Sequence, residues 1–239
     1  MLRESIIFLL RPGKVETFDI AYSTIFKYLF FLGLFRGVGE FVLNIFINRE
    51  QELILSIFLA GYGLDWFMNM PLPFILWNII TAYFLWAFIS FMIKKVGMLL
   101  GGEVDNKKIE VACAYLMTLY ITVPIFNLLH LILDVPYYRY FKFFGFTPYI
   151  GAGEVLEAIW AVIIMCLIAK RLLKMSSVRA IAVALSPVFV GYGMWVFSGV
   201  VFVKFFTAIG MPLAVRSPYA IVLYYSITMG VLTIYFLKT

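Results

Sequence analysis

The chain has 239 residues, of which 64% are hydrophobic and 13% are charged, and its net charge is +6. An ordinary soluble domain has about a quarter of its residues charged, and it cannot bury this much apolar surface, whereas a bilayer can. The basic residues stand in short clusters between apolar runs, which favours contact with anionic lipid headgroups over binding of nucleic acid. We therefore expect an integral membrane protein whose partner is the lipid bilayer, with no nucleic acid partner.

The N-terminal segment, residues 1–27, is predicted to be cytoplasmic. Its first apolar stretch, residues 6–10, is too short for the core of a signal peptide, and Arg11-Pro12-Gly13 follows where a small-residue cleavage site would stand. Charged residues flank the longer segment 2–10, which is predicted to form a helix that lies on the inner membrane surface.

Six apolar stretches meet the length that a helix needs to cross the hydrocarbon, about 20 residues at about 1.5 Å each. In chain order they are residues 28–47, 72–93, 111–133, 151–169, 181–203 and 219–237. A lipid-facing barrel would show alternating polarity over short segments instead. The predicted fold is therefore all-α, a polytopic transmembrane helical bundle of about six spans.

The basic residues outside these spans alternate between the two sides of the membrane. Thirteen fall on one side: Arg3, Arg11, Lys14, Lys27, Lys94, Lys95, Lys107, Lys108, Lys170, Arg171, Lys174, Arg179 and Lys238. Five fall on the other: Arg49, Arg139, Lys142, Lys204 and Arg216. Since cytoplasmic loops carry the excess of Lys and Arg, both termini are predicted to lie in the cytoplasm.

Residues 53–70 form a further apolar stretch in the first outer loop. Gly61, Gly63 and Asp65 interrupt it, and Pro71 closes it. A seventh crossing here would invert every later loop and spoil the alternation of charge. We interpret the stretch as an interfacial or re-entrant helix.

Arg36 and Glu40 stand four residues apart in the first predicted span and therefore on one helix face. A charge at the bilayer centre costs about 2.5–3.5 kcal/mol on insertion scales, so each one calls for a partner. The favoured interpretation is an internal ion pair turned towards the bundle interior. The alternative is a charge that lines the path of a solute.

Five further polar residues fall at the outer ends of the third and fourth predicted spans: Asn127, His130, Asp134, Glu154 and Glu157. If these spans form an antiparallel hairpin, the five converge with Arg36 and Glu40 into an intramembrane polar cluster. Such a cluster can bind a cation, relay protons or hold the metal of an intramembrane hydrolase. One histidine is few for zinc, and no His-Glu-x-x-His motif occurs. We predict no catalytic residue, metal or cofactor, and keep the hydrolase as an alternative.

Small residues and prolines shape the predicted spans. Gly33 and Gly37 form a small-xxx-small pattern that lets helices approach closely, here within the bundle. Pro124 and Pro187 fall inside the third and fifth spans and are predicted to kink them.

The second loop carries a candidate docking surface. Gly101 and Gly102 end one helix, and Lys107 and Lys108 begin the next. The loop is either a turn whose lysines meet anionic lipid or a surface that docks a cytoplasmic protein.

Several short motifs stand at corresponding places around the spans: Leu10-Arg11-Pro12, Leu99-Leu100-Gly101-Gly102, Ala114-Tyr115 with Pro124, and Arg179-Ala180-Ile181-Ala182-Val183 with Pro187. Together with the topology, over about residues 10–200, this pattern resembles the Yip family. These are polytopic membrane proteins whose eukaryotic members interact with Rab-type small GTPases. The resemblance implies a five-span membrane domain at 28–203, followed here by an outer loop and an additional span in 204–239.

The resemblance implies a non-enzymatic protein that organises the membrane or recruits a cytoplasmic or membrane protein partner. The Asp-Leu-Tyr-Gly-Pro motif of the eukaryotic trafficking members is absent, which favours a prokaryotic branch and a plasma-membrane location, with an endomembrane as the alternative. A second expected function, from another class, is a small-solute or ion transporter that uses the intramembrane polar cluster.

Overall fold

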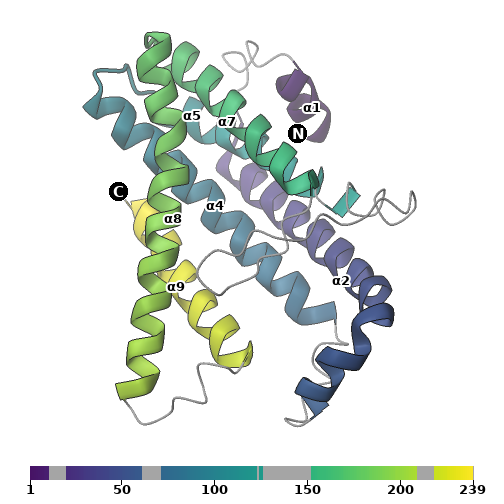
Figure 1. Ribbon diagram of the computed structural model, residues 1–239. Helices are drawn as coiled ribbons and strands as arrows, with labels where there is room; N and C mark the ends of the chain where they lie inside the picture. The colour runs from purple at the N-terminus through teal and green to yellow at the C-terminus, as the bar shows by residue number, and fades with distance from the viewer. Residues whose placement is uncertain (11–19, 61–70, 123, 126–151, 209–217, 239) are drawn as a thin grey trace.

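The fold is seen in a computed structural model, which describes the chain except for residues 11–19, 61–70, 123, 126–151, 209–217 and 239 (Figure 1). Every element within the described residues is helical, which confirms the all-α prediction for this part of the chain. The elements are α1 (Leu2–Leu10), α2 (Tyr22–Ala60), α4 (Pro71–Leu99), α5 (Asn106–Leu116), the 3-10 helix η2 (Met117–Ile121), α7 (Ala152–Leu172), α8 (Ser177–Ala208) and α9 (Pro218–Lys238).

Helix α2 is much longer than the first predicted span, 28–47. It has 39 residues, about 58 Å at 1.5 Å per residue, and its end turns away from the direction of its beginning (Figure 1). The stretch 53–70, predicted to be an interfacial or re-entrant helix, is helical over residues 53–60, but these residues continue α2 and do not form a separate helix; residues 61–70 lie outside the described part. The connecting residues 48–52 contain neither glycine nor proline, so nothing local stops the helix.

Helices α2 and α4 approach closely at Gly33. A Cβ added there would lie 2.5 Å from the Cα of Ile79 and 2.9 Å from the carbonyl oxygen of Asn78. Only glycine allows two helix backbones to come this near. The expected use of Gly33 for packing inside the bundle is confirmed.

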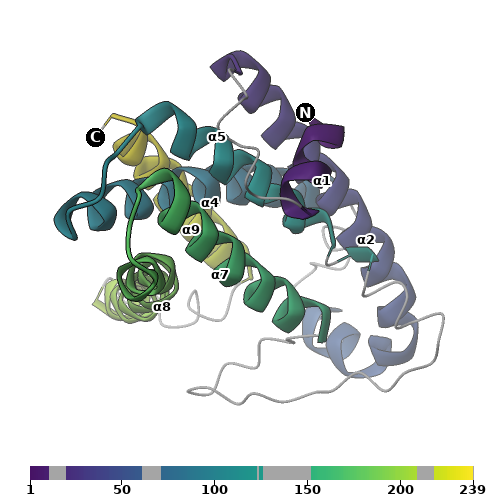
Figure 2. The same ribbon diagram turned by 90° about the horizontal axis from the view of Figure 1, so that it is seen from above.

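The core is centred on α5 and η2. Every residue from 111 to 120 is buried, and α1, α2, α4 and α7 all contact this segment. Seen from above, α1 lies over the side of the bundle away from α8 (Figure 2). The largest fully buried side chains include Trp86 of α4 and Tyr115 of α5.

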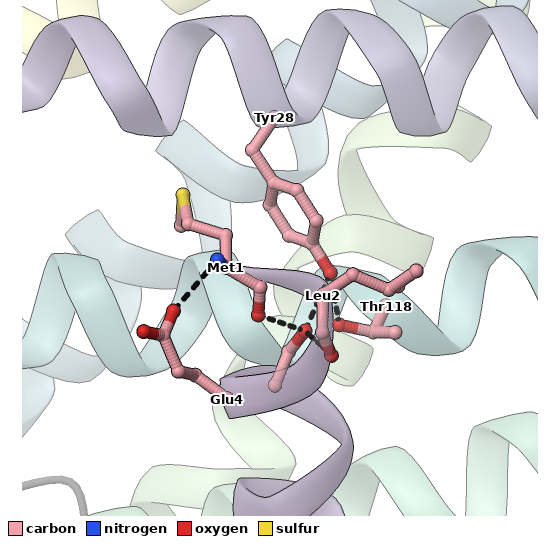
Figure 3. A network of polar contacts seen from close by, with 6 residues as sticks. Met1, Leu2, Glu4, Tyr28 and Thr118 are labelled. Carbon is pink, nitrogen blue, oxygen red and sulfur yellow. Dashed lines mark hydrogen bonds and ion pairs between the residues drawn. The ribbon is translucent and has the colours of Figure 1, made fainter.

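Helix α1 is covered by protein on one side. Phe8, 1% exposed, lies against Tyr115 with ring centroids 5.6 Å apart. The hydroxyl of Ser5 is 2.7 Å from that of Tyr28 on α2, which in turn is 2.6 Å from the hydroxyl of Thr118 on η2 (Figure 3). The predicted helix at 2–10 exists, and hydrogen bonds join it to the bundle.

Two helices of the described part are long and apolar enough to cross a bilayer, at Ile75–Leu99 and Ser177–Met194, and Ile227–Leu237 is a shorter apolar helix. The outward faces of α8 and α9 are apolar; Phe189 and Phe197 are 70% and 71% exposed. The ends of α4 and α7 and the start of α8 gather at one end of the molecule (Figure 1). The end of α2 and the starts of α4 and α9 lie towards the opposite end.

Candidate functional site

The turn after α4 is built by two glycines. Gly101 has a φ of +79°, in the left-handed region that glycine adopts without strain. Its N–H donates to the carbonyl of Met98 at 3.0 Å, and that of Gly102 donates to the carbonyl of Gly97 at 2.9 Å. This pair of bonds is the Schellman motif, which satisfies the last carbonyls of a helix.

Helix α7 ends in a similar way, but with a lysine in the left-handed position. Lys174 has a φ of +51°, and the N–H of Met175 donates to the carbonyl of Lys170 at 3.2 Å. Non-glycine residues rarely adopt this conformation because the Cβ crowds the backbone. The conformation brings the Lys174 ammonium to the carboxylate of Glu103, 2.5 Å away, on the turn after α4.

Further contacts join these two turns into one surface, which we call the joined turns (residues 99–108 and 170–179). The N–H of Glu103 donates to the carbonyl of Leu173 at 3.1 Å, and the Arg179 guanidinium donates to the carbonyl of Leu100 at 3.3 Å. Gly102 lies under Leu173, where a Cβ would be 3.0 Å from the leucine Cβ. The predicted docking residues thus belong to a surface made by two loops.

Lys107 and Lys108 of the predicted docking loop are exposed in the first turn of α5. Asp105 caps this helix, accepting from the N–H of Lys108 at 3.2 Å. That backbone hydrogen bond, together with the Lys108 ammonium at 3.3 Å, lowers the pKa of Asp105.

A pocket of about 310 Å³ lies between the two loops. Its lining carries both signs of charge: Glu103, Val104, Asp105, Lys108, Arg171, Leu172 and Lys174. Since each loop contributes part of the lining, the pocket exists only because the turns are joined.

An ion pair lies beside the joined turns, between α4 and α5. The Lys94 ammonium is 2.9 Å from a carboxylate oxygen of Glu110, and both side chains are largely buried. The indole N–H of Trp86 donates to the carbonyl of Glu110 at 2.9 Å. A hydrogen bond to the same carboxylate raises the pKa of Tyr22, at the start of α2, to about 12. These contacts hold three helices together behind the joined turns.

The third predicted span is not a continuous α-helix. It changes from α to 3-10 at Met117, seven residues before Pro124. Proline has no N–H, so the carbonyl four residues earlier, that of Tyr120, lacks its α-helical donor. The guanidinium of Arg36 on α2 donates to this carbonyl at 3.3 Å.

Arg36 also lies over the ring of Tyr120, 4.0 Å from its centroid, a favourable cation–π contact. The Tyr120 hydroxyl donates to the side-chain oxygen of Asn78 on α4 at 2.9 Å. Gly39 makes room for the break, since a Cβ there would be 2.8 Å from the Cβ of Pro124. We call this arrangement the Arg36–Tyr120 site (Arg36, Gly39, Asn78, Tyr120, Pro124).

The predicted intramembrane polar cluster is tested by the structure only in part. Arg36 contacts Tyr120 as described. The side chains of Glu40 and Glu154 and all of Asn127, His130 and Asp134 lie outside the described residues, and Glu157 lies partly buried on α7. The structure therefore neither gathers this cluster nor separates it. The described residues contain no group of three His, Cys, Asp or Glu side chains placed to hold a metal.

Local spacing pointed to Glu40 as the partner of Arg36 and did not point to Tyr120. The sequence did contain a signal for the contact with Tyr120: because Pro124 has no N–H, the carbonyl four residues before it must accept its hydrogen bond from another donor. The pocket residues Glu103, Arg171 and Lys174 were missed as a group, since they come from two loops.

Comparison with protein-family models, with curated proteins and with solved structures finds no match to this chain.

Proposed function

We propose that this chain is a non-enzymatic integral membrane protein of about six spans with both ends in the cytoplasm. In this proposal it organises the membrane or recruits a protein partner through the joined turns, in a prokaryotic plasma membrane. The observation that carries the proposal is the union of two basic loops at one end of the bundle by Glu103, Leu173 and Arg179. The resemblance to the Yip family points the same way.

Three features support the membrane placement. Two helices of the described part are long and apolar enough to cross, and the exposed faces of α8 and α9 are apolar. The ends of α4 and α7, where basic residues gather, share one end of the molecule (Figure 1), as the positive-inside rule requires of cytoplasmic loops.

Topology is tested by labelling single cysteines with a membrane-impermeant maleimide, after Cys113 and Cys166 are changed to Ala. Lys107→Cys reports on the joined turns and Lys204→Cys on the far end of α8; both positions are exposed. We expect Lys204→Cys to be labelled from outside intact cells and Lys107→Cys only after permeabilisation. Labelling of both from one side would contradict the proposed topology.

Recruitment is tested by crosslinking in native membranes. A partner of the joined turns should be recovered with the wild type and with Lys204→Glu, and lost with Lys107→Glu. Equal recovery from all three proteins, together with unaltered membrane shape after deletion of the chain, would contradict the proposed role.

A small-solute or ion transporter is the second candidate, favoured by the Arg36–Tyr120 site. Transporters place substrate sites where spanning helices are broken, and in the third predicted span the helix changes from α to 3-10 at Met117. Liposome flux measurements decide between the two: substrate-dependent transport that Arg36→Met abolishes would promote this candidate.

A further inference from the structure

The pocket between the joined turns has an uneven balance of charge. Three cations, Lys108, Arg171 and Lys174, face two carboxylates. Lys108 pairs with Asp105 at 3.3 Å, and Lys174 pairs with Glu103. Among the described residues no carboxylate lies within ion-pair distance of Arg171. One positive charge in the pocket is thus left without an internal counter-charge.

The remaining cation is the kind that suits a phosphate. A guanidinium offers planar, paired donors that match phosphate oxygens, and it stays charged at any physiological pH. Leu172 and Val104 add apolar surface to the lining. The net charge of about +1 suits a group with a single negative charge.

The position of the pocket indicates which kind of molecule carries the phosphate group. Arg171 belongs to the last turn of α7, directly after the predicted fourth span, so the proposed topology puts it at the depth of the inner headgroups. Basic pockets at cytoplasmic helix ends are where anionic lipid headgroups bind.

We infer that the pocket between the joined turns binds the singly charged phosphodiester of an anionic phospholipid headgroup, with Arg171 as its principal ligand. The inference rests on the proposed membrane placement. The headgroup contacts both loops at once, so bound lipid stabilises the joined turns. Lys108 and Lys174 lie at the sides of the phosphate, each held by its own carboxylate.

The test uses the full chain purified in a neutral detergent, with the midpoint of thermal unfolding followed as a probe is added. The probes are dioctanoyl phosphatidylglycerol, dioctanoyl phosphatidylcholine and inorganic phosphate. We expect phosphatidylglycerol to raise the midpoint most. Arg171→Gln should weaken the apparent affinity about tenfold, the size of one charged hydrogen bond.

Lys170→Gln is the matched control, because it removes one exposed charge from the neighbouring residue, which does not line the pocket. It should change the affinity less than about twofold. Arg171→Lys keeps the charge, so its apparent affinity for phosphatidylglycerol should lie between those of Arg171→Gln and Lys170→Gln. It replaces Arg171→Gln in the test if Arg171→Gln has a much lower unfolding midpoint than the wild type without lipid.

Three results would overturn the inference: no midpoint shift with phosphatidylglycerol, an equal loss in Arg171→Gln and Lys170→Gln, or an equal shift with inorganic phosphate. The last would show that a free phosphate is the ligand. Because binding is measured in detergent, these failures are distinct from a failure of the cysteine labelling, which tests the membrane placement.

Discussion

Pro124 and Pro187 stand in two helices that meet the loss of a backbone donor in different ways. Around Pro187, α8 stays α-helical from Ser177 to Ala208, and the hydroxyl of Ser186 donates to the freed carbonyl of Val183 at 2.7 Å. Before Pro124 the helix changes to 3-10, and the carbonyl of Tyr120 accepts a hydrogen bond from Arg36, 84 residues away. Where the neighbouring residue donates to the carbonyl four residues before the proline, as in α8, the α-helix continues unchanged. Where the donor comes from another helix, as before Pro124, the hydrogen bond joins two helices at the point where the helix geometry changes.

The largest expected effect comes from Arg36→Met. The variant leaves the Tyr120 carbonyl without its long-range donor and removes the cation from the tyrosine ring. We expect it to lower the free energy of unfolding by about 2–3 kcal/mol, measured by detergent denaturation in mixed micelles. Arg36→Lys should recover part of the loss. A loss below about 0.5 kcal/mol for Arg36→Met would show that the long-range donor near Pro124 stabilises the fold no more than an ordinary surface contact does.

Gly39→Ala tests the space beside the break. Its new Cβ would lie 2.8 Å from the Cβ of Pro124, so α2 must move away, and we expect a loss of about 1–3 kcal/mol in the same assay. Gly193→Ala on α8 is the matched control, because among the described residues no atom beyond its chain neighbours and its own helix backbone lies within 4 Å of the added Cβ. That variant should be neutral or gain up to about 1 kcal/mol. Equal losses of stability in Gly39→Ala and Gly193→Ala would show that the close approach of Gly39 to Pro124 is not the cause of the loss.

Ser186→Ala should have a smaller effect than Arg36→Met. It removes one local hydroxyl donor from the Val183 carbonyl, which costs about 1 kcal/mol. Helix content measured by circular dichroism should not change, since α8 already tolerates Pro187. If this loss matched that of Arg36→Met, the local and the long-range donors would be equivalent.

The smallest effect concerns pH at the start of α5, where Asp105 is the N-cap and its side chain accepts from the N–H of Lys108. The pKa of Asp105 is lower in the folded state than its ordinary 3.8. Its contribution is therefore complete above the unfolded pKa and is lost as the pH falls through the folded pKa. Because the side chain is half exposed, we expect the wild type to lose only a few tenths of a kcal/mol more than Asp105→Asn between about pH 5 and pH 3. Identical pH profiles for the two proteins would exclude this role.

The sequence predicted the helices well because long apolar runs leave few alternatives. All six predicted spans overlap helices of the structure, although the third is described only to residue 125. Helix ends were less predictable: α4 continues to Leu99, so Lys94 and Lys95 are helical residues and not part of a loop. Lysine is a good helix former, so two lysines at the end of an apolar run do not end the helix.

The candidate sites could be predicted only where their contacts are local. Gly101 and Asp105 act on residues within one turn, and their capping roles follow from residue type. Arg36 and Tyr120 are far apart in the chain, as are Glu103 and Leu173. Such pairs depend on how helices pack, which periodicity along one helix does not specify.

A double-mutant cycle between Arg36→Met and Pro124→Ala tests the link between the arginine and the proline most directly. Pro124→Ala restores an N–H four residues after Tyr120, so the carbonyl no longer depends on Arg36. We predict that Arg36→Met costs at least about 1 kcal/mol less in the Pro124→Ala background than in the wild type. The same cost in both backgrounds would show that Arg36 does not donate to the Tyr120 carbonyl in place of the N–H that Pro124 lacks.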